Sequence, residues 1–112
     1  MVSNGKAPAH LKAATKRWWL EVTQEFDLDT HHLRLLQLAA EAWDRCEQAR
    51  KILAREGITY VDRFDSPKAR PEIQIERDSR LGFARLLREL GLDAAGDPEA
   101  PRSPVLPGNR RN

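Results

Sequence analysis

Hydrophobic positions follow a helical period in three segments of the chain. The longest segment runs from Asp29 to Gly57 and contains no proline and no internal glycine. At about 1.5 Å per residue, it predicts a helix roughly 40 Å long. One face repeats apolar or small side chains at steps of three and four, which is the pattern of a buried stripe. These positions are Leu35, Leu38, Ala39, Ala42, Cys46, Ala49 and Leu53.

A second apolar face covers only the first half of this long segment. It consists of Leu33, Leu36, Ala40 and Trp43. A short chain has little material with which to cover two faces of one long helix. An apolar surface left open marks a site of protein contact. The pattern therefore predicts that these four residues form the interface of a homo-oligomer.

Both ends of the long helix carry recognisable signals. Asp29 is placed to accept backbone hydrogen bonds as the N-cap, and Leu28 and Leu33 suit a hydrophobic staple. At the other end, Gly57 suits a left-handed C-terminal residue, with Ile58 predicted to fold back over the helix end. The long helix is therefore expected to begin and end sharply.

Shorter helices are predicted on either side of the long one. The first runs from His10 or Leu11 to about Phe26, and its short join to the long helix favours a helical hairpin. The last begins at Pro71, which suits the N1 position, and closes at Gly91. Its predicted apolar face consists of Ile75, Phe83, Leu86, Leu87 and Leu90.

Between the long helix and the last one, the period changes to that of extended chain. Residues 58–61 are β-branched and aromatic, residues 62–67 have turn composition, and residues 68–70 can pair back. This predicts a short β-hairpin or an extended turn. An isolated two-stranded hairpin is marginally stable in water, so it is expected to dock on the helices or on a neighbouring molecule.

These elements predict a mainly α fold with one helical domain at residues 10–92. Residues 1–9 are expected to form a flexible arm. Residues 93–112 contain four of the seven prolines and few apolar groups, which predicts a disordered, proline-rich tail.

The amino-acid composition says more about the cellular location of the protein than about a reaction that it could catalyse. The net charge is +2 and the single cysteine excludes an internal disulfide, which favours a reducing compartment. No apolar run approaches the length of a membrane span, and the first residues do not resemble a signal peptide. A soluble, cytoplasmic protein is expected.

Catalytic and metal-binding patterns are weak. The six glycines form no phosphate-binding loop. His31 and His32 are adjacent on a predicted helix, so they should point about 100° apart and chelate one metal poorly. Cys46 falls on the apolar stripe and is predicted to be a core residue. Five carboxylates span a turn and different helix faces, which favours turn and cap roles over a metal site. They are Asp62, Asp65, Glu72, Glu76 and Asp78.

Basic residues form two groups that suit phosphate contacts, although each could also be an ordinary solvated face. The group around the first helix is Lys6, Lys12, Lys16 and Arg17. The group on the last helix is Arg77, Arg80, Arg85 and Arg88. Both are candidate DNA-binding residues, whereas a helix-turn-helix reading of the first two helices has little support, because the second helix is too long.

Several stretches occur in the order typical of one protein family. They are K-R-W-W-L-E-V, then D-x-H-H-L-R-L-L, then G-I-T-Y-x-D-R-F, then R-P-E-I and E-R-D-S-R-L-G-F. In this order the chain resembles the P27 family of phage terminase small subunits over roughly residues 7–93.

The resemblance implies a protein without catalysis or cofactor, acting in the host cytoplasm. It implies recognition of double-stranded viral DNA at the packaging start, and recruitment and regulation of the terminase large subunit, in a ring-like homo-oligomer. The alternative is a helical scaffold that does not bind DNA directly. In the tail, Val105 and Leu106 could serve as a docking peptide for the large subunit, or belong to a frayed terminus.

Overall fold

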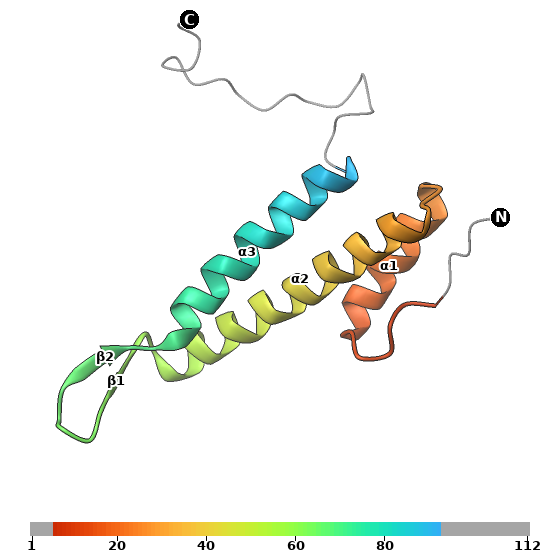
Figure 1. The fold of residues 1–112 in the computed structure, drawn as a ribbon. Coiled ribbons are helices and arrows are strands. Elements are labelled where there is room, and N and C mark those ends of the chain that lie inside the picture. The colour runs from red at the N-terminus through yellow and green to blue at the C-terminus, as the bar shows by residue number, and fades with distance from the viewer. Residues whose placement is uncertain (1–5, 93–112) are drawn as a thin grey trace, which may run out of the picture.

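The computed structural model describes residues 6–92. It contains three helices, α1 (Ala13–Glu25), α2 (Thr30–Glu56) and α3 (Pro71–Leu90), and two strands, β1 (Thr59–Val61) and β2 (Pro67–Ala69). Figure 1 shows α3 running back beside α2, α1 packed on the first half of α2, and the two strands projecting beyond the opposite end. The predicted mainly α fold is confirmed. Most of the predicted N-terminal arm and the whole predicted tail, with Val105 and Leu106, lie outside the described residues.

The helix boundaries follow local chemistry. The Asp29 carboxylate accepts a hydrogen bond from the His32 backbone N–H at 3.1 Å, which confirms it as the N-cap of α2. Pro71 stands at the start of α3, where its missing N–H costs nothing. At the end of α3, Gly91 is left-handed and the Leu92 N–H donates to the Leu87 carbonyl at 3.0 Å, as in a Schellman motif.

The end of α2 differs from the prediction. Gly57 has the expected positive φ of 86°, but its ψ of −180° directs the chain outward into β1. Ile58 is consequently 62% exposed and does not cover the helix end. The backbone conformation of Gly57 therefore directs the hairpin away from the three helices.

One hydrophobic core lies where α1, the first half of α2 and the end of α3 meet. Leu36 and Ala40 are fully buried there, together with Trp19 from α1 and Leu90 from α3. The prediction that Leu36 and Ala40 form a surface between subunits is therefore corrected, because two other helices of the same chain cover them. Leu33 also packs against this core, whereas Trp43 stays 41% exposed.

In the second half of α2, small side chains allow α3 to approach closely. Cys46 and Ala49 are buried on α2, and Ser79 is buried on α3. The predicted stripe is thus right at these positions. It is wrong at Leu38, which is 54% exposed.

The β-hairpin is confirmed, with Thr59 opposite Ala69 and Val61 opposite Pro67 in antiparallel register. Every strand residue is exposed. Its turn is fixed by the Asp62 carboxylate, which accepts hydrogen bonds from the backbone N–H groups of Phe64 at 2.8 Å and Ser66 at 3.0 Å. The hairpin is locally well formed, yet in the described chain it does not pack against the helical core.

Candidate nucleic-acid interface

The four predicted arginines of α3 are exposed. Arg77, Arg80 and Arg88 lie within an arc of about 80° on a helical wheel, since each residue advances about 100°. Arg77 pairs only loosely with Asp78, at 3.8 Å. Among the described residues, Arg85 and Arg88 take part in no ion pair. This face is therefore an accessible positive surface. Arg80 differs from the other three arginines because it forms a close ion pair with Glu76.

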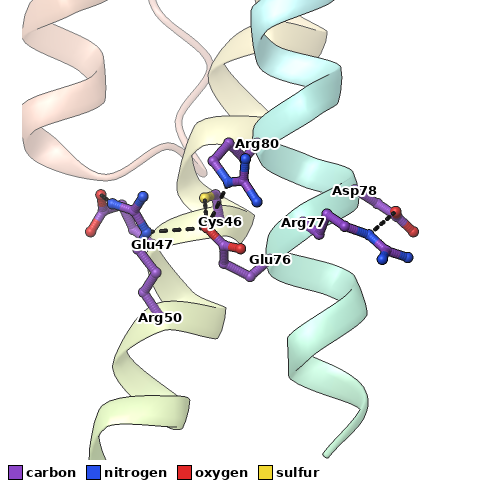
Figure 2. A network of polar contacts seen from close by, with 7 residues as sticks. All are labelled: Cys46, Glu47, Arg50, Glu76, Arg77, Asp78 and Arg80. Carbon is purple, nitrogen blue, oxygen red and sulfur yellow. Dashed lines mark hydrogen bonds and ion pairs between the residues drawn. The ribbon is translucent and has the colours of Figure 1, made fainter.

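Arg80 belongs to a polar network that ties α3 to α2 (Figure 2). A single carboxylate oxygen, Oε2 of Glu76, accepts hydrogen bonds from Arg80 Nε at 3.2 Å, from Arg50 Nε at 3.3 Å and from Cys46 Sγ at 3.5 Å. The Glu76 side chain is only 16% exposed. Its charge is compensated because two guanidinium groups face it. Arg80, which belongs to the predicted DNA-binding face, thus also stabilises the Glu76 carboxylate that joins α3 to α2.

The network shifts the titration of two of its members. The hydrogen bond from Arg80 lowers the pKa of Glu76, with Cys46 and Arg50 adding to the effect. Burial raises the pKa of the Cys46 thiol, and its contact with Glu76 raises it further. Cys46 therefore stays a thiol near neutral pH, which agrees with its prediction as a core residue.

We expect the Glu76 network to lose its stabilising effect in acid. The folded-state pKa of Glu76 lies below its ordinary value of 4.5, so the stabilisation is present above that value and is lost as the pH falls through the folded pKa. The free energies of unfolding of the wild type and of Glu76→Gln, measured in urea by circular dichroism, should differ at pH 7, and the difference should shrink as the pH falls below 4.5. The control Asp78→Asn, whose partner Arg77 lies 3.8 Å away on the exposed side of the same helix, should change little. An unchanged difference between the wild type and Glu76→Gln across this range would contradict the role of Glu76.

The predicted basic residues of α1 surround its N-terminal end. Lys6, Lys12 and Arg17 are exposed, and Lys16 is half-buried. The Lys12 backbone N–H donates to Asp44 Oδ2 at 2.8 Å, and the Thr15 hydroxyl donates to Asp44 Oδ1 at 2.5 Å. The Asp44 carboxylate, which belongs to α2, therefore caps the N-terminus of α1, where the helix dipole favours a negative charge. This basic group and the α3 arginines remain on separate helices.

An aromatic groove separates these two helices. It is lined by Trp18, Trp43 and Phe83, with Ala14 and Thr15, and has a volume of about 280 Å³. The Phe83 ring centroid lies 5.8 Å from that of Trp18 and 5.1 Å from that of Trp43. Sequence reasoning placed these aromatic residues on separate apolar faces and missed the groove that they form together.

Sequence reasoning also missed the role of Glu76. A signal was present, because steps of three and four back from Phe83 along α3 reach Ser79, Glu76 and Glu72 rather than Ile75. Ile75 was predicted on the buried face and is 38% exposed. Polar residues on the inner face of a helix indicate a buried polar network, which here is the contact with Arg50 and Cys46.

The histidines behave differently from the prediction. Both Nδ1 atoms approach Asp29 Oδ1, at 3.2 Å for His31 and 2.7 Å for His32, so the two rings do not diverge. Within residues 6–92 these three form the one group of His, Cys, Asp and Glu whose ligand atoms lie close together. They sit at the N-terminus of α2, where the helix dipole disfavours a cation, and Asp29 is already engaged as the N-cap. The carboxylates of residues 62–78 do not form such a group in this part of the chain.

No helix within the described range is both long and apolar enough to cross a bilayer. In comparisons with known proteins, a family model described as phage terminase, small subunit, matches residues 12–98. The search of curated proteins found no match. The search of solved structures found none either.

Proposed function

Because this chain belongs to the family of phage terminase small subunits, we propose that it recognises viral DNA at the packaging start. In this proposal it also recruits and regulates the large subunit, which carries the ATPase and the nuclease. Terminase small subunits are generally regulatory proteins without catalysis. We propose the same for this chain, acting in the host cytoplasm as a ring-like homo-oligomer.

Within this family, we propose membership of the narrower P27 group. The support is the ordered set of stretches, above all G-I-T-Y-x-D-R-F followed by E-R-D-S-R-L. The first of these stretches begins at Gly57, the C-cap of α2, and continues through β1 into the turn. The second lies in α3 beside α2.

The observation that carries DNA recognition is the exposed arginine face of α3. Guanidinium groups suit phosphate contacts because they present several donors in a fixed plane. Arg77, Arg85 and Arg88 project from one rigid helix, and no described partner neutralises Arg85 or Arg88. Because α3 is already folded, such a row can contact a duplex backbone without the cost of ordering its own backbone. Lys12, Lys16 and Arg17 on α1 would extend the contact.

The alternative function is a helical scaffold that does not bind DNA directly. The pairing of Arg80 with Glu76 at 3.2 Å favours it, since this arginine already has a structural role. The two functions differ in how binding responds to salt. Phosphate contacts release counterions and weaken steeply as the salt concentration rises.

We expect the double variant Arg77→Ala, Arg88→Ala to bind duplex DNA more weakly across sequences. Each lost phosphate contact should reduce the slope of log affinity against log salt by about 0.9, or roughly two units for both. Fluorescence anisotropy with labelled duplexes at several salt concentrations measures this. Arg80 is left unchanged because its loss would remove one partner of Glu76, the carboxylate that joins α3 to α2.

The matched control is Arg34→Ala, Arg45→Ala, which removes two exposed charges from α2. If both double variants show the same affinity and slope as the wild type, the α3 arginines are a solvated face and the scaffold function stands. If both double variants lose the same amount of DNA affinity, binding depends on the net charge of the protein and not on the α3 arginines in particular.

A further inference from the structure

The β-hairpin presents the most exposed of the large hydrophobic side chains in the described chain. Phe64 at its tip is 75% exposed, and Ile58 and Val61 are each 62% exposed. The guanidinium of Arg63 lies 4.9 Å from the centre of the Phe64 ring, so the tip combines an aromatic ring with a positive charge. An isolated two-stranded hairpin gains little stability in water, and exposed apolar side chains gathered on such an element favour contact with another protein.

The same chain carries a groove of matching chemistry. Its walls are the rings of Trp18, Trp43 and Phe83, and its volume of about 280 Å³ admits one aromatic side chain. Next to the groove, a second hollow shares Ala14, Thr15 and Trp43 with it and adds the carboxylate of Glu47. Glu47 is 37% exposed and pairs only loosely with Arg50, at 3.7 Å. The same hollow also contains the cations Lys12, Lys51 and Arg55, and the carboxylate of Asp44, which already accepts hydrogen bonds from α1. The groove is therefore apolar inside, and its rim carries charges of both signs, among which Glu47 is a carboxylate with only a loose ion pair.

The hairpin cannot reach the groove of its own chain. From Trp43 to Gly57, α2 is continuous helix, which separates the two by roughly 20 Å at about 1.5 Å per residue. Beyond Gly57 the strands continue away from the helical body (Figure 1). Only a second copy can bring a Phe64 side chain to this groove.

We propose that the hairpin tip of one subunit docks in the Trp18–Trp43–Phe83 groove of the next, with Phe64 packed against the rings that line it and Arg63 facing Glu47. The interface deepens the proposed function, because it rests on the proposed assembly into a homo-oligomer. It joins two different surfaces, so each subunit gives a hairpin and receives one. Such a head-to-tail contact produces a closed ring where the rotation between subunits closes, and an open filament where it does not.

Two single substitutions remove the two halves of the contact. Phe64→Ser removes the aromatic tip, and Ala14→Trp fills the groove from an exposed position on α1. Each should weaken self-association at least tenfold in sedimentation velocity on the full-length protein without DNA. Leu38→Ser, which removes another exposed apolar side chain, on α2, should assemble like the wild type.

Mixing the two variants gives the sharpest test. Phe64→Ser keeps an open groove and Ala14→Trp keeps an intact tip, so together they can form one productive contact and no more. Native mass spectrometry should show a 1:1 heterodimer in the mixture and monomers of each variant alone. Larger mixed assemblies, or no mixed species, would overturn the proposal.

A charge exchange tests the same contact without changing its apolar parts. Arg63→Glu and Glu47→Arg should each weaken association, and the double variant should recover it. If circular dichroism shows that Ala14→Trp has lost helicity, the mixing test cannot be used, and the charge exchange alone tests the contact. Failure of the double variant to recover, or wild-type assembly by Phe64→Ser, would exclude the contact.

Two further outcomes separate this interface from the proposed function. A wild type that is monomeric at high micromolar concentration yet binds DNA overturns the interface and leaves DNA recognition standing. A wild type that assembles but does not bind DNA overturns DNA recognition and leaves the interface standing. A chain truncated after Leu92 that is monomeric, while Phe64→Ser assembles, would assign the groove to residues 93–112 and also overturn the proposal.

Discussion

Replacement of Leu36 by alanine is expected to lower the free energy of unfolding by about 2–5 kcal/mol. Leu36 is the largest side chain that is fully buried in the described fold, and it lies in the core between α1, α2 and the end of α3. Alanine would leave a cavity that three rigid helices fill only in part, so lost burial and the cavity both contribute. In a domain of this size, such a loss is a large fraction of the total stability.

Urea unfolding followed by circular dichroism measures this change, and it should be repeated at several protein concentrations because assembly also contributes to stability. Leu38→Ala is the matched control on the same helix, since Leu38 is 54% exposed and should change by less than about 1 kcal/mol. Similar losses for both variants would mean that Leu36 is not the core residue that the structure describes.

The second large effect is expected at Asp44. Its two carboxylate oxygens accept hydrogen bonds from the Lys12 backbone N–H and from the Thr15 hydroxyl, which join α2 to the start of α1. Lys12 makes no side-chain cap of its own, so Asp44→Ala would leave the first turn of α1 without this acceptor. Hydrogen bonds to charged groups contribute about 1.5–3 kcal/mol, and we expect a loss of this size.

The loss at Asp44 should be local as well as global. Hydrogen exchange should accelerate first at the backbone amides of α1, while α2 and α3 keep their protection. Asp44→Asn keeps one of the two acceptor oxygens and should recover part of the loss. Equal exchange in α1 for Asp44→Ala and the wild type would argue against capping by Asp44.

Sequence alone determined the elements of this fold, because the signals for them are local. The three helices follow from the spacing of apolar residues, and Asp29, Pro71 and Gly91 mark their ends through groups that lie within a few residues. The hairpin follows from β-branched residues around a turn held by Asp62. The basic residues of α3 were also identified from their spacing, since exposure on the outer face of a helix needs no partner.

Only the tertiary structure decided which apolar face is covered and by what. Leu36 and Ala40 read as a second open face because the sequence does not reveal that α1 and the end of α3 converge on the same half of α2. The groove of Trp18, Trp43 and Phe83 combines one aromatic residue from each helix, and the contact of Glu76 with Arg50 and Cys46 joins two helices. Periodicity records the direction in which a side chain leaves its own helix. Its neighbours across the fold depend on how the helices are packed, and that arrangement placed Leu36 and Ala40, two residues of the predicted subunit surface, in the core.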